Sequence, residues 1–197
     1  MLFSVFRRVN SKPAILRIIR HRIRPPGLSY NPRMTLFEFF PKQKEAVRAR
    51  SKEVFVLLRP EHMNWKPEQG ALSVGEMLRH LWVSEEGVRR CALEGDFSYY
   101  ETRMPKGLRA ITGTPRSLAE ELADIDRAHR ETLAAVAARS PEFFEEERAH
   151  PGLGFRRKVA VMLFGINEHE VHHRAQLMTY LRMLGTPAPE PFKLPAK

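Results

Sequence analysis

The sequence predicts an all-α protein, an antiparallel four-helix bundle with long connecting loops. Four segments repeat apolar residues at the spacing of an amphipathic helix. No segment has a convincing strand pattern, and proline and glycine gather in the connections. Helices that each have one apolar face are expected to pack around a shared core. A length of 197 residues suits one such domain, which we place at residues 34–197.

A first helix is expected over residues 35–58 and a second over residues 73–93, with a loop rich in proline and glycine between them. The apolar positions of the first helix are Leu36, Phe39, Phe40, Ala46, Val54 and Leu57. The second helix has a capping box at its start, because Glu76 follows Ser73 by three residues. One broad face of it carries Met77, His80, Leu81, Ser84 and Val88. We therefore expect His80 to point inward.

Residues 95–113 contain proline and glycine and are expected to form a long irregular crossing. The third helix is expected over residues 114–139, because Thr114 is a capping residue and Pro115 suits the first helical position. Its apolar positions are Leu118, Leu122, Ile125, Leu133 and Val136. A second loop leads to the fourth helix, which is expected from about Phe155 to a glycine cap at Gly185.

The formal charge of +10 is unevenly distributed. Residues 1–33 contain eight Lys or Arg and no Asp or Glu, whereas the rest of the chain has 25 basic and 23 acidic residues. A nearly neutral domain lacks the basic surface that binding to many phosphates requires. Nucleic acid is therefore not an expected partner, despite the high isoelectric point.

The basic N-terminal extension, residues 1–33, has three interpretations. Its composition suits a cleaved targeting peptide, and its apolar residues would also suit a helix lying on an anionic membrane. Alternatively, translation begins at Met34, where the first core-like pattern starts. We expect a disordered extension or an artefact of start-site choice.

Cysteine content and hydropathy exclude two further classes. The single cysteine, Cys91, excludes an intramolecular disulfide framework and a multi-cysteine zinc site, and we expect it to be a small buried residue. No uninterrupted run of about 18 apolar residues occurs, so no transmembrane helix is expected. The cytoplasm is the expected location.

The fourth helix carries a pair of histidines with the spacing of a chelating site. His169 and His173 are four residues apart, so their imidazoles project from the same face of the helix. That face also carries Met162, Ile166, Leu177, Tyr180 and Leu184. The pair is therefore expected to point into the core.

Helices two and four can face each other across a four-helix bundle, which would bring His80 to this pair. Three neutral imidazoles leave a divalent ion at least one open position, as in reactive rather than closed structural sites. The alternative is that His80 forms an ordinary core hydrogen bond and that the pair on the fourth helix is incidental. Residue spacing alone does not decide between the two.

Two segments together resemble the DinB family of metal-binding four-helix bundles. They are residues 72–80, LSVGEMLRH, and residues 169–185, HEVHHRAQLMTYLRMLG. The resemblance implies that the metal ligands are His80, His169 and His173. It also implies that His172, which lies about 100° away from His173 around the helix, is not a ligand. Ala175 stands where the family commonly has glycine.

Three other residues of the fourth helix are candidates for supporting roles. Asn167 and Gln176 are near enough in helical position to orient a ligand or a bound water. Glu170 is a candidate general base, with a surface ion pair as the alternative.

The resemblance implies a metal-dependent hydrolase or a transferase that uses a low-molecular-weight thiol, acting on a small electrophilic substrate and forming a homodimer through helix faces. The alternative is a metal-binding, stress-associated or interaction protein without turnover. An open cleft beside the metal would favour the enzyme, and a sealed apolar shell the alternative. Three imidazoles suit zinc, nickel and iron alike.

Overall fold

Four long helices form the body of the protein in the computed structural model, which describes residues 34–187 and 189. The elements are α1 (Leu36–Phe55), α2 (Val74–Glu94), α3 (Leu108–Thr112), α4 (Leu118–Ala137), β1 (Glu147–His150), β2 (Phe155–Lys158) and α5 (Val159–Met183). The predicted basic extension, residues 1–33, lies outside the described residues. No helix in the described part of the chain is long and apolar enough to cross a membrane.

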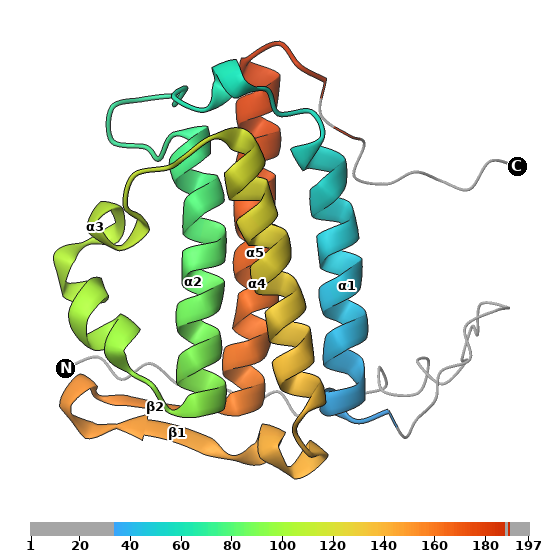
Figure 1. Ribbon diagram of the computed structural model, residues 1–197, viewed down its shortest axis with the longest axis vertical. Coiled ribbons are helices and arrows are strands. Elements are labelled where there is room, and N and C mark those ends of the chain that lie inside the picture. The colour runs from blue at the N-terminus through green and yellow to red at the C-terminus, as the bar shows by residue number, and fades with distance from the viewer. Residues whose placement is uncertain (1–33, 188, 190–197) are drawn as a thin grey trace, which may run out of the picture. The chain divides into compact units, whose positions relative to one another are not determined.

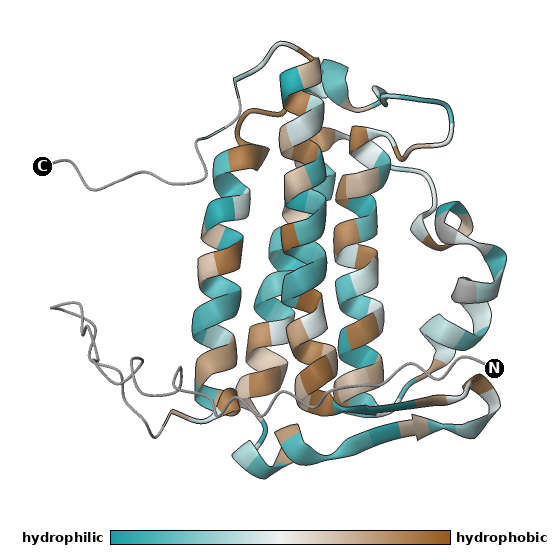
Figure 2. Cartoon of the chain, turned by 180° about the vertical axis from the view of Figure 1, so that it is seen from behind, coloured by the Kyte–Doolittle hydropathy of each residue, from teal (hydrophilic) through white to brown (hydrophobic). Residues whose placement is uncertain are grey.

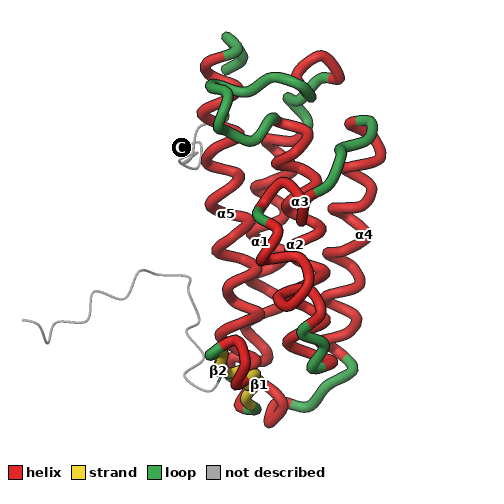
Figure 3. The backbone as a smooth tube through the Cα atoms, turned by 90° about the vertical axis from the view of Figure 1, so that its left-hand side faces the viewer, coloured by secondary structure: helices red, strands yellow, loops and turns green. Residues whose placement is uncertain are grey.

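The predicted all-α four-helix bundle is confirmed. Its connections determine which of the long helices run in the same direction and which run in opposite directions. In Figure 1, α1 and α5 run upward, whereas α2 and α4 run downward. The chain returns from the end of α2 to the start of α4 through the segment that contains α3, which packs on the outer side of α2 (Figures 1 and 3). Short helical turns interrupt the connections at Pro60–His62, Tyr99–Arg103, Met104–Lys106, Pro141–Glu145 and Pro151–Leu153.

Three of the four long helices begin at a capping box, and one of these starts later than predicted. The predicted third long helix is α4, which begins at Leu118 rather than at Thr114-Pro115. The Ser117 side chain accepts from the Glu120 amide, and the Glu120 carboxylate accepts from the Ser117 amide. This reciprocal pair satisfies two of the unpaired amides at a helix start, which a single threonine cap does not.

A two-stranded hairpin crosses the lower end of the bundle (Figure 1), in a segment where the sequence has no convincing strand pattern. Strands β1 and β2 pair antiparallel, with Glu147 opposite Lys158 and His150 opposite Phe155. As a result, the last helix begins at Val159, not near Phe155. Each strand has only four residues and buries none of them, so it lacks the alternation that identifies a strand in a sequence.

Two large apolar clusters fill the bundle on either side of a polar layer, and a third, small cluster of Val83, Tyr99 and Ile111 lies between α2 and the connection that follows it. One large cluster packs the end of α1 against the start of α2 and the end of α5, through residues such as Val54, Met77 and Leu181. The other large cluster packs the opposite ends of the same helices, through Phe40 and Leu163. Figure 2 shows the same division, with hydrophilic residues prominent in the middle of the helices. The polar layer contains the candidate site.

The inward face of α1 differs from the predicted apolar stripe. Leu36, Phe39 and Ala46 are exposed, whereas Lys44 and Arg48 are buried. Phe40 and Val54 are buried as expected. Charged side chains are rarely buried unless they are paired, so apolar spacing alone did not reveal the middle of the buried face. The partners of these cations come from α2 and α5, as described below.

Candidate metal centre

His80, His169 and His173 meet in the polar layer and turn their Nε2 atoms toward one another. His169 Nε2 lies 3.0 Å from His80 Nε2 and 3.0 Å from His173 Nε2. His80 comes from α2, and the other two are one turn apart on α5. Among the described residues, this is the cluster of His, Cys, Asp or Glu whose geometry suits a metal ion. The structure thus brings together the three predicted ligands.

Hydrogen bonds to the other ring nitrogens hold two of these imidazoles. His173 Nδ1 lies 2.7 Å from Gln176 Oε1, and His80 Nδ1 lies 3.1 Å from Ser84 Oγ. Ser84 Oγ also lies 3.1 Å from the Tyr99 hydroxyl. An amide oxygen only accepts, so His173 donates from Nδ1 and leaves its Nε2 lone pair directed at the cluster.

This arrangement of donors fits a bound cation. The three Nε2 atoms lie close enough together to share one ion. A divalent metal can accept a lone pair from each neutral ring, and imidazole nitrogen is one of its common protein ligands. Hydrogen bonds that fix the ligand tautomers are a regular feature of metal sites.

Burial keeps the three imidazoles neutral. Burial is the largest cause of the shifts that lower the pKa of His80 to about 4 and that of His169 to about 3. The pKa of His173 is also lowered by burial, although its hydrogen bond to Gln176 opposes the shift. Near neutral pH, all three rings are therefore deprotonated, the form that binds metals.

The remaining candidates on α5 have different surroundings. His172 is exposed, lines the first of the two chambers described below, and does not belong to the cluster of three histidines. Asn167 is buried and donates from Nδ2 to Gln43 of α1, at 2.9 Å, rather than to a histidine of the cluster. Glu170 is also buried, and both of its carboxylate oxygens accept from Arg48 at 3.0 Å.

A network of buried charges lies beside the histidine cluster, and the sequence did not reveal it. Lys44 Nζ lies 2.8 Å from the Glu85 carboxylate, although their alignment is not that of a hydrogen bond. Arg48 contacts both Glu85 and Glu170, and it also donates to the Ile125 carbonyl. These residues lie on four different helices, so no local pattern could have found the network.

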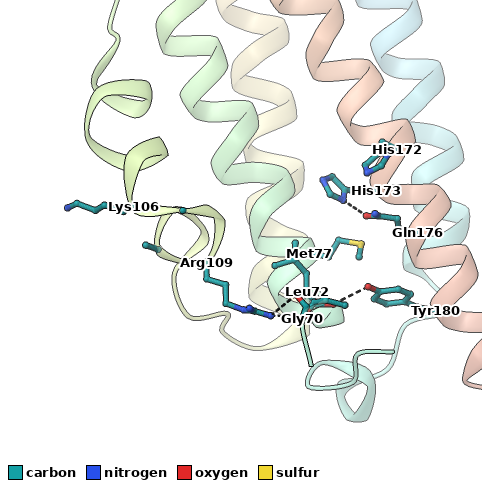
Figure 4. Close-up of a pocket in the computed structure, with 12 residues that line it drawn as sticks. Gly70, Leu72, Met77, Lys106, Arg109, His172, His173, Gln176 and Tyr180 are labelled. Carbon is teal, nitrogen blue, oxygen red and sulfur yellow. Dashed lines mark hydrogen bonds between the residues drawn. The ribbon is translucent and has the colours of Figure 1, made fainter. Parts of the chain in front are cut away.

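Two open chambers flank the histidine cluster. The first, of about 580 Å³, is lined by His173, Gln176, Tyr180 and residues of the connections around Gly70 and Arg109. Figure 4 shows the His173–Gln176 hydrogen bond at this chamber. The second, of about 490 Å³, is lined by His80, His169 and mostly apolar residues. Both volumes are in the range of small-molecule sites.

Fold and site together define a four-helix bundle with a cluster of three histidines arranged as metal ligands. The model of the DinB superfamily matches residues 43–177, a segment that includes α2 and the three histidines. The chain therefore belongs to the DinB superfamily, as its sequence resemblance suggested. A comparison with curated proteins found no match.

Two solved structures from Bacillus subtilis are similar in fold. The DinB-like protein YjoA has 20% sequence identity and a TM-score of 0.60, over 77% of this chain and 96% of YjoA. YfiT has 16% identity and a TM-score of 0.58, over 83% of this chain and 94% of YfiT. YfiT is described as a probable metal-dependent hydrolase with an unusual four-helix bundle topology.

Proposed function

We propose that this protein is a metal-dependent hydrolase of small substrates, with His80, His169 and His173 as the metal ligands. The observation that carries the proposal is the convergence of three neutral imidazoles beside two open chambers. A sealed apolar shell would instead favour a metal site without turnover. The description of YfiT as a probable metal-dependent hydrolase supports the same reaction class.

The protein's residues hold and orient the metal site in this proposal. When bound, a divalent ion such as zinc, nickel or iron supplies Lewis acidity and lowers the pKa of a coordinated nucleophile. Gln176 and Ser84 fix the rings of His173 and His80 through their Nδ1 atoms. The chambers admit the substrate and keep it next to the cluster.

Glu170 and Asn167 have supporting roles in this proposal. Because both carboxylate oxygens of Glu170 accept from Arg48, we assign Glu170 to the attachment of α5 to α1. Asn167 reaches the same helix through Gln43. A general-base role for Glu170 would require its carboxylate to leave Arg48, and it stays a prediction.

A transferase that uses a low-molecular-weight thiol is the second candidate. The presence of two chambers beside one histidine cluster favours it, because a transferase needs room for two substrates. Hydrolysis needs room for one substrate and a water molecule. The two candidates use the same ligands and differ in the nucleophile that attacks the substrate.

The test is an assay of the purified full chain loaded in turn with zinc, nickel or iron(II). Hydrolysis is followed with 4-nitrophenyl acetate, and thiol transfer with L-cysteine and 1-chloro-2,4-dinitrobenzene. We expect metal-dependent turnover that His80→Ala, His169→Ala and His173→Ala each abolish, together with metal binding. His172→Ala is the matched control for metal binding, because this neighbouring histidine is exposed and lies outside the cluster of three.

The outcomes separate the candidates. Ester hydrolysis without added thiol supports the hydrolase, and turnover only with cysteine supports the transferase. Stoichiometric metal without turnover of either substrate favours the non-catalytic metal-binding protein. Full metal retention in all three single variants would exclude this site. The predicted homodimer is tested separately, by sedimentation of the metal-loaded protein.

A further inference from the structure

We propose that the second chamber, beside His80 and His169, binds an aromatic group of the substrate. This inference rests on the proposed function, because that function places a metal beside the chamber. It adds the chemical class of the substrate. The chamber encloses about 490 Å³, enough for a compound with one or two aromatic rings.

The walls of the chamber are apolar and largely aromatic. They include Tyr99, Tyr100, Ile111, Phe155, Met162 and Ile166. The ring centroid of Tyr100 lies 5.3 Å from that of Tyr99 and 5.5 Å from that of Phe155. Aromatic walls at these separations offer both faces and edges to a further ring.

Ser84 and Glu85 of the chamber already have partners, and the guanidinium of Arg157 lies over the Phe155 ring, 5.7 Å from its centroid. Ser84 Oγ lies between His80 Nδ1 and the Tyr99 hydroxyl. The Glu85 carboxylate is paired with Lys44 and Arg48. A ligand in the chamber therefore meets apolar side chains along its length and the imidazoles of the candidate metal centre, which favours an apolar body with a reactive polar end.

At Gly165, no side chain fills the chamber wall. It lies on α5, one turn before His169, and it lines the chamber. A Cβ atom at this position would have no neighbouring atom within 4 Å, and its backbone φ is not positive. A Cβ atom can therefore be added here without a clash, and a larger side chain would extend into space that we assign to the ligand.

The first experiment measures the affinity of the second chamber for an aromatic compound in the metal-free protein. The probe is N-phenyl-1-naphthylamine, an uncharged aromatic dye, and its fluorescence is titrated with the metal-free full chain. We expect saturable binding to the wild-type protein and at least a tenfold weaker affinity for Gly165→Leu. The matched control is Gly70→Leu, because Gly70 lines the other chamber and its Cβ position is also open.

The second experiment connects the chamber with the metal. Imidazole and 4-phenylimidazole are titrated into the cobalt(II)-loaded protein, and coordination is followed in the visible spectrum. Burial of the phenyl ring is expected to make 4-phenylimidazole bind about 10- to 100-fold more tightly than imidazole. In Gly165→Leu the ratio of the affinity for 4-phenylimidazole to that for imidazole should fall close to one. The affinity for imidazole and the cobalt content should stay unchanged.

The results distinguish this inference from the proposed function. Dye binding that Gly165→Leu weakens, in a protein that binds no cobalt, would support the aromatic site and contradict the metal-dependent function. Cobalt binding without a preference for 4-phenylimidazole would overturn the aromatic site alone. Equal loss of dye binding in Gly165→Leu and Gly70→Leu would also overturn it, because the effect would not belong to this chamber.

Discussion

Individual contacts at His173 and His80 determine how the two rings present themselves to a metal. Gln176 accepts from His173 Nδ1, which leaves the Nε2 lone pair of that ring for the cluster, and Ser84 Oγ contacts His80 Nδ1. Helical spacing identified Gln176 as a candidate for this role, but it gave no reason to choose Ser84. The contact that Ser84 makes depends on the side chain of His80 one turn earlier on the same helix and on Tyr99 from the following connection.

Loss of the Gln176 carbonyl should weaken metal binding. We expect Gln176→Leu to lower metal affinity about 10- to 100-fold, because the His173 ring loses the group that fixes its tautomer. Gln176→Glu keeps an acceptor and should retain most of the affinity. Competition with a chromophoric chelator measures the difference. Asn167→Leu is the comparison, since Asn167 contacts Gln43 instead, and an equal loss in that variant would contradict the assignment.

His129 should make stability depend on pH. Burial, followed by the nearby cations Arg48 and Lys44, lowers its pKa from 6.5 to about 3. Above pH 6.5 both folded and unfolded chains have this ring neutral. As the pH falls below 6.5 the unfolded chain takes up the proton first, so stability is lost progressively until about pH 3.

The test compares urea unfolding of the wild-type protein and His129→Gln between pH 7 and pH 4.5. Glutamine does not titrate, so the variant should lose less stability as the pH falls, by up to about 1.4 kcal/mol per pH unit. Parallel pH profiles for the two proteins would show that His129 does not contribute. The metal-free protein is used for both, which removes the pH dependence of metal binding.

At the scale of elements, α1 packs against the bundle with charges as well as apolar groups. Its ends contribute Phe40 and Val54 to the two apolar clusters, whereas Lys44 and Arg48 in its middle face acidic residues of α2 and α5. The pattern of apolar residues therefore identified the helix and the buried residues at its ends, but not the buried charges in its middle. Removal of a partner from such a network leaves an uncompensated buried charge.

Substitution of Arg48 should strongly destabilise the fold. Arg48→Met leaves Glu170 without its bidentate partner, and we expect a loss of about 3–5 kcal/mol in the free energy of unfolding. The matched control on the same helix is Lys52→Met. Lys52 is exposed and pairs with Asp126 at 3.3 Å, so its loss should cost less than about 1 kcal/mol. Equal effects in urea unfolding would contradict the importance of the buried network.

At the scale of the whole molecule, the candidate metal centre links α2 to α5 in the middle of the bundle. The two helices run in opposite directions and contact each other directly. His80 lies on the first third of α2, and the other two histidines lie on either side of the middle of α5. A metal bound by all three would therefore connect chain segments that are about ninety residues apart in sequence.

Metal binding should raise the thermal stability of the whole domain. A ligand present at about one hundred times its dissociation constant stabilises the folded state by about 2.7 kcal/mol. For a protein of this size, this corresponds to an increase of roughly 5–10 °C in Tm. Calorimetry with and without a chelator measures the shift. It should disappear in His173→Ala and persist in His172→Ala, and a shift that persists in both would place the metal elsewhere.

The sequence by itself determined the helical class, the start of α1 and α2 and, through the family resemblance, which three histidines are candidate ligands; their convergence is a property of the tertiary structure. Helical periodicity, capping boxes and the spacing of His169 and His173 are local properties, and two distinctive motifs carried the family resemblance. Only the tertiary structure decided the β1–β2 hairpin, the buried charges of α1 and the two chambers. The physical reason is that each of these depends on partners from elements distant in the sequence, which residue spacing within one element does not reveal.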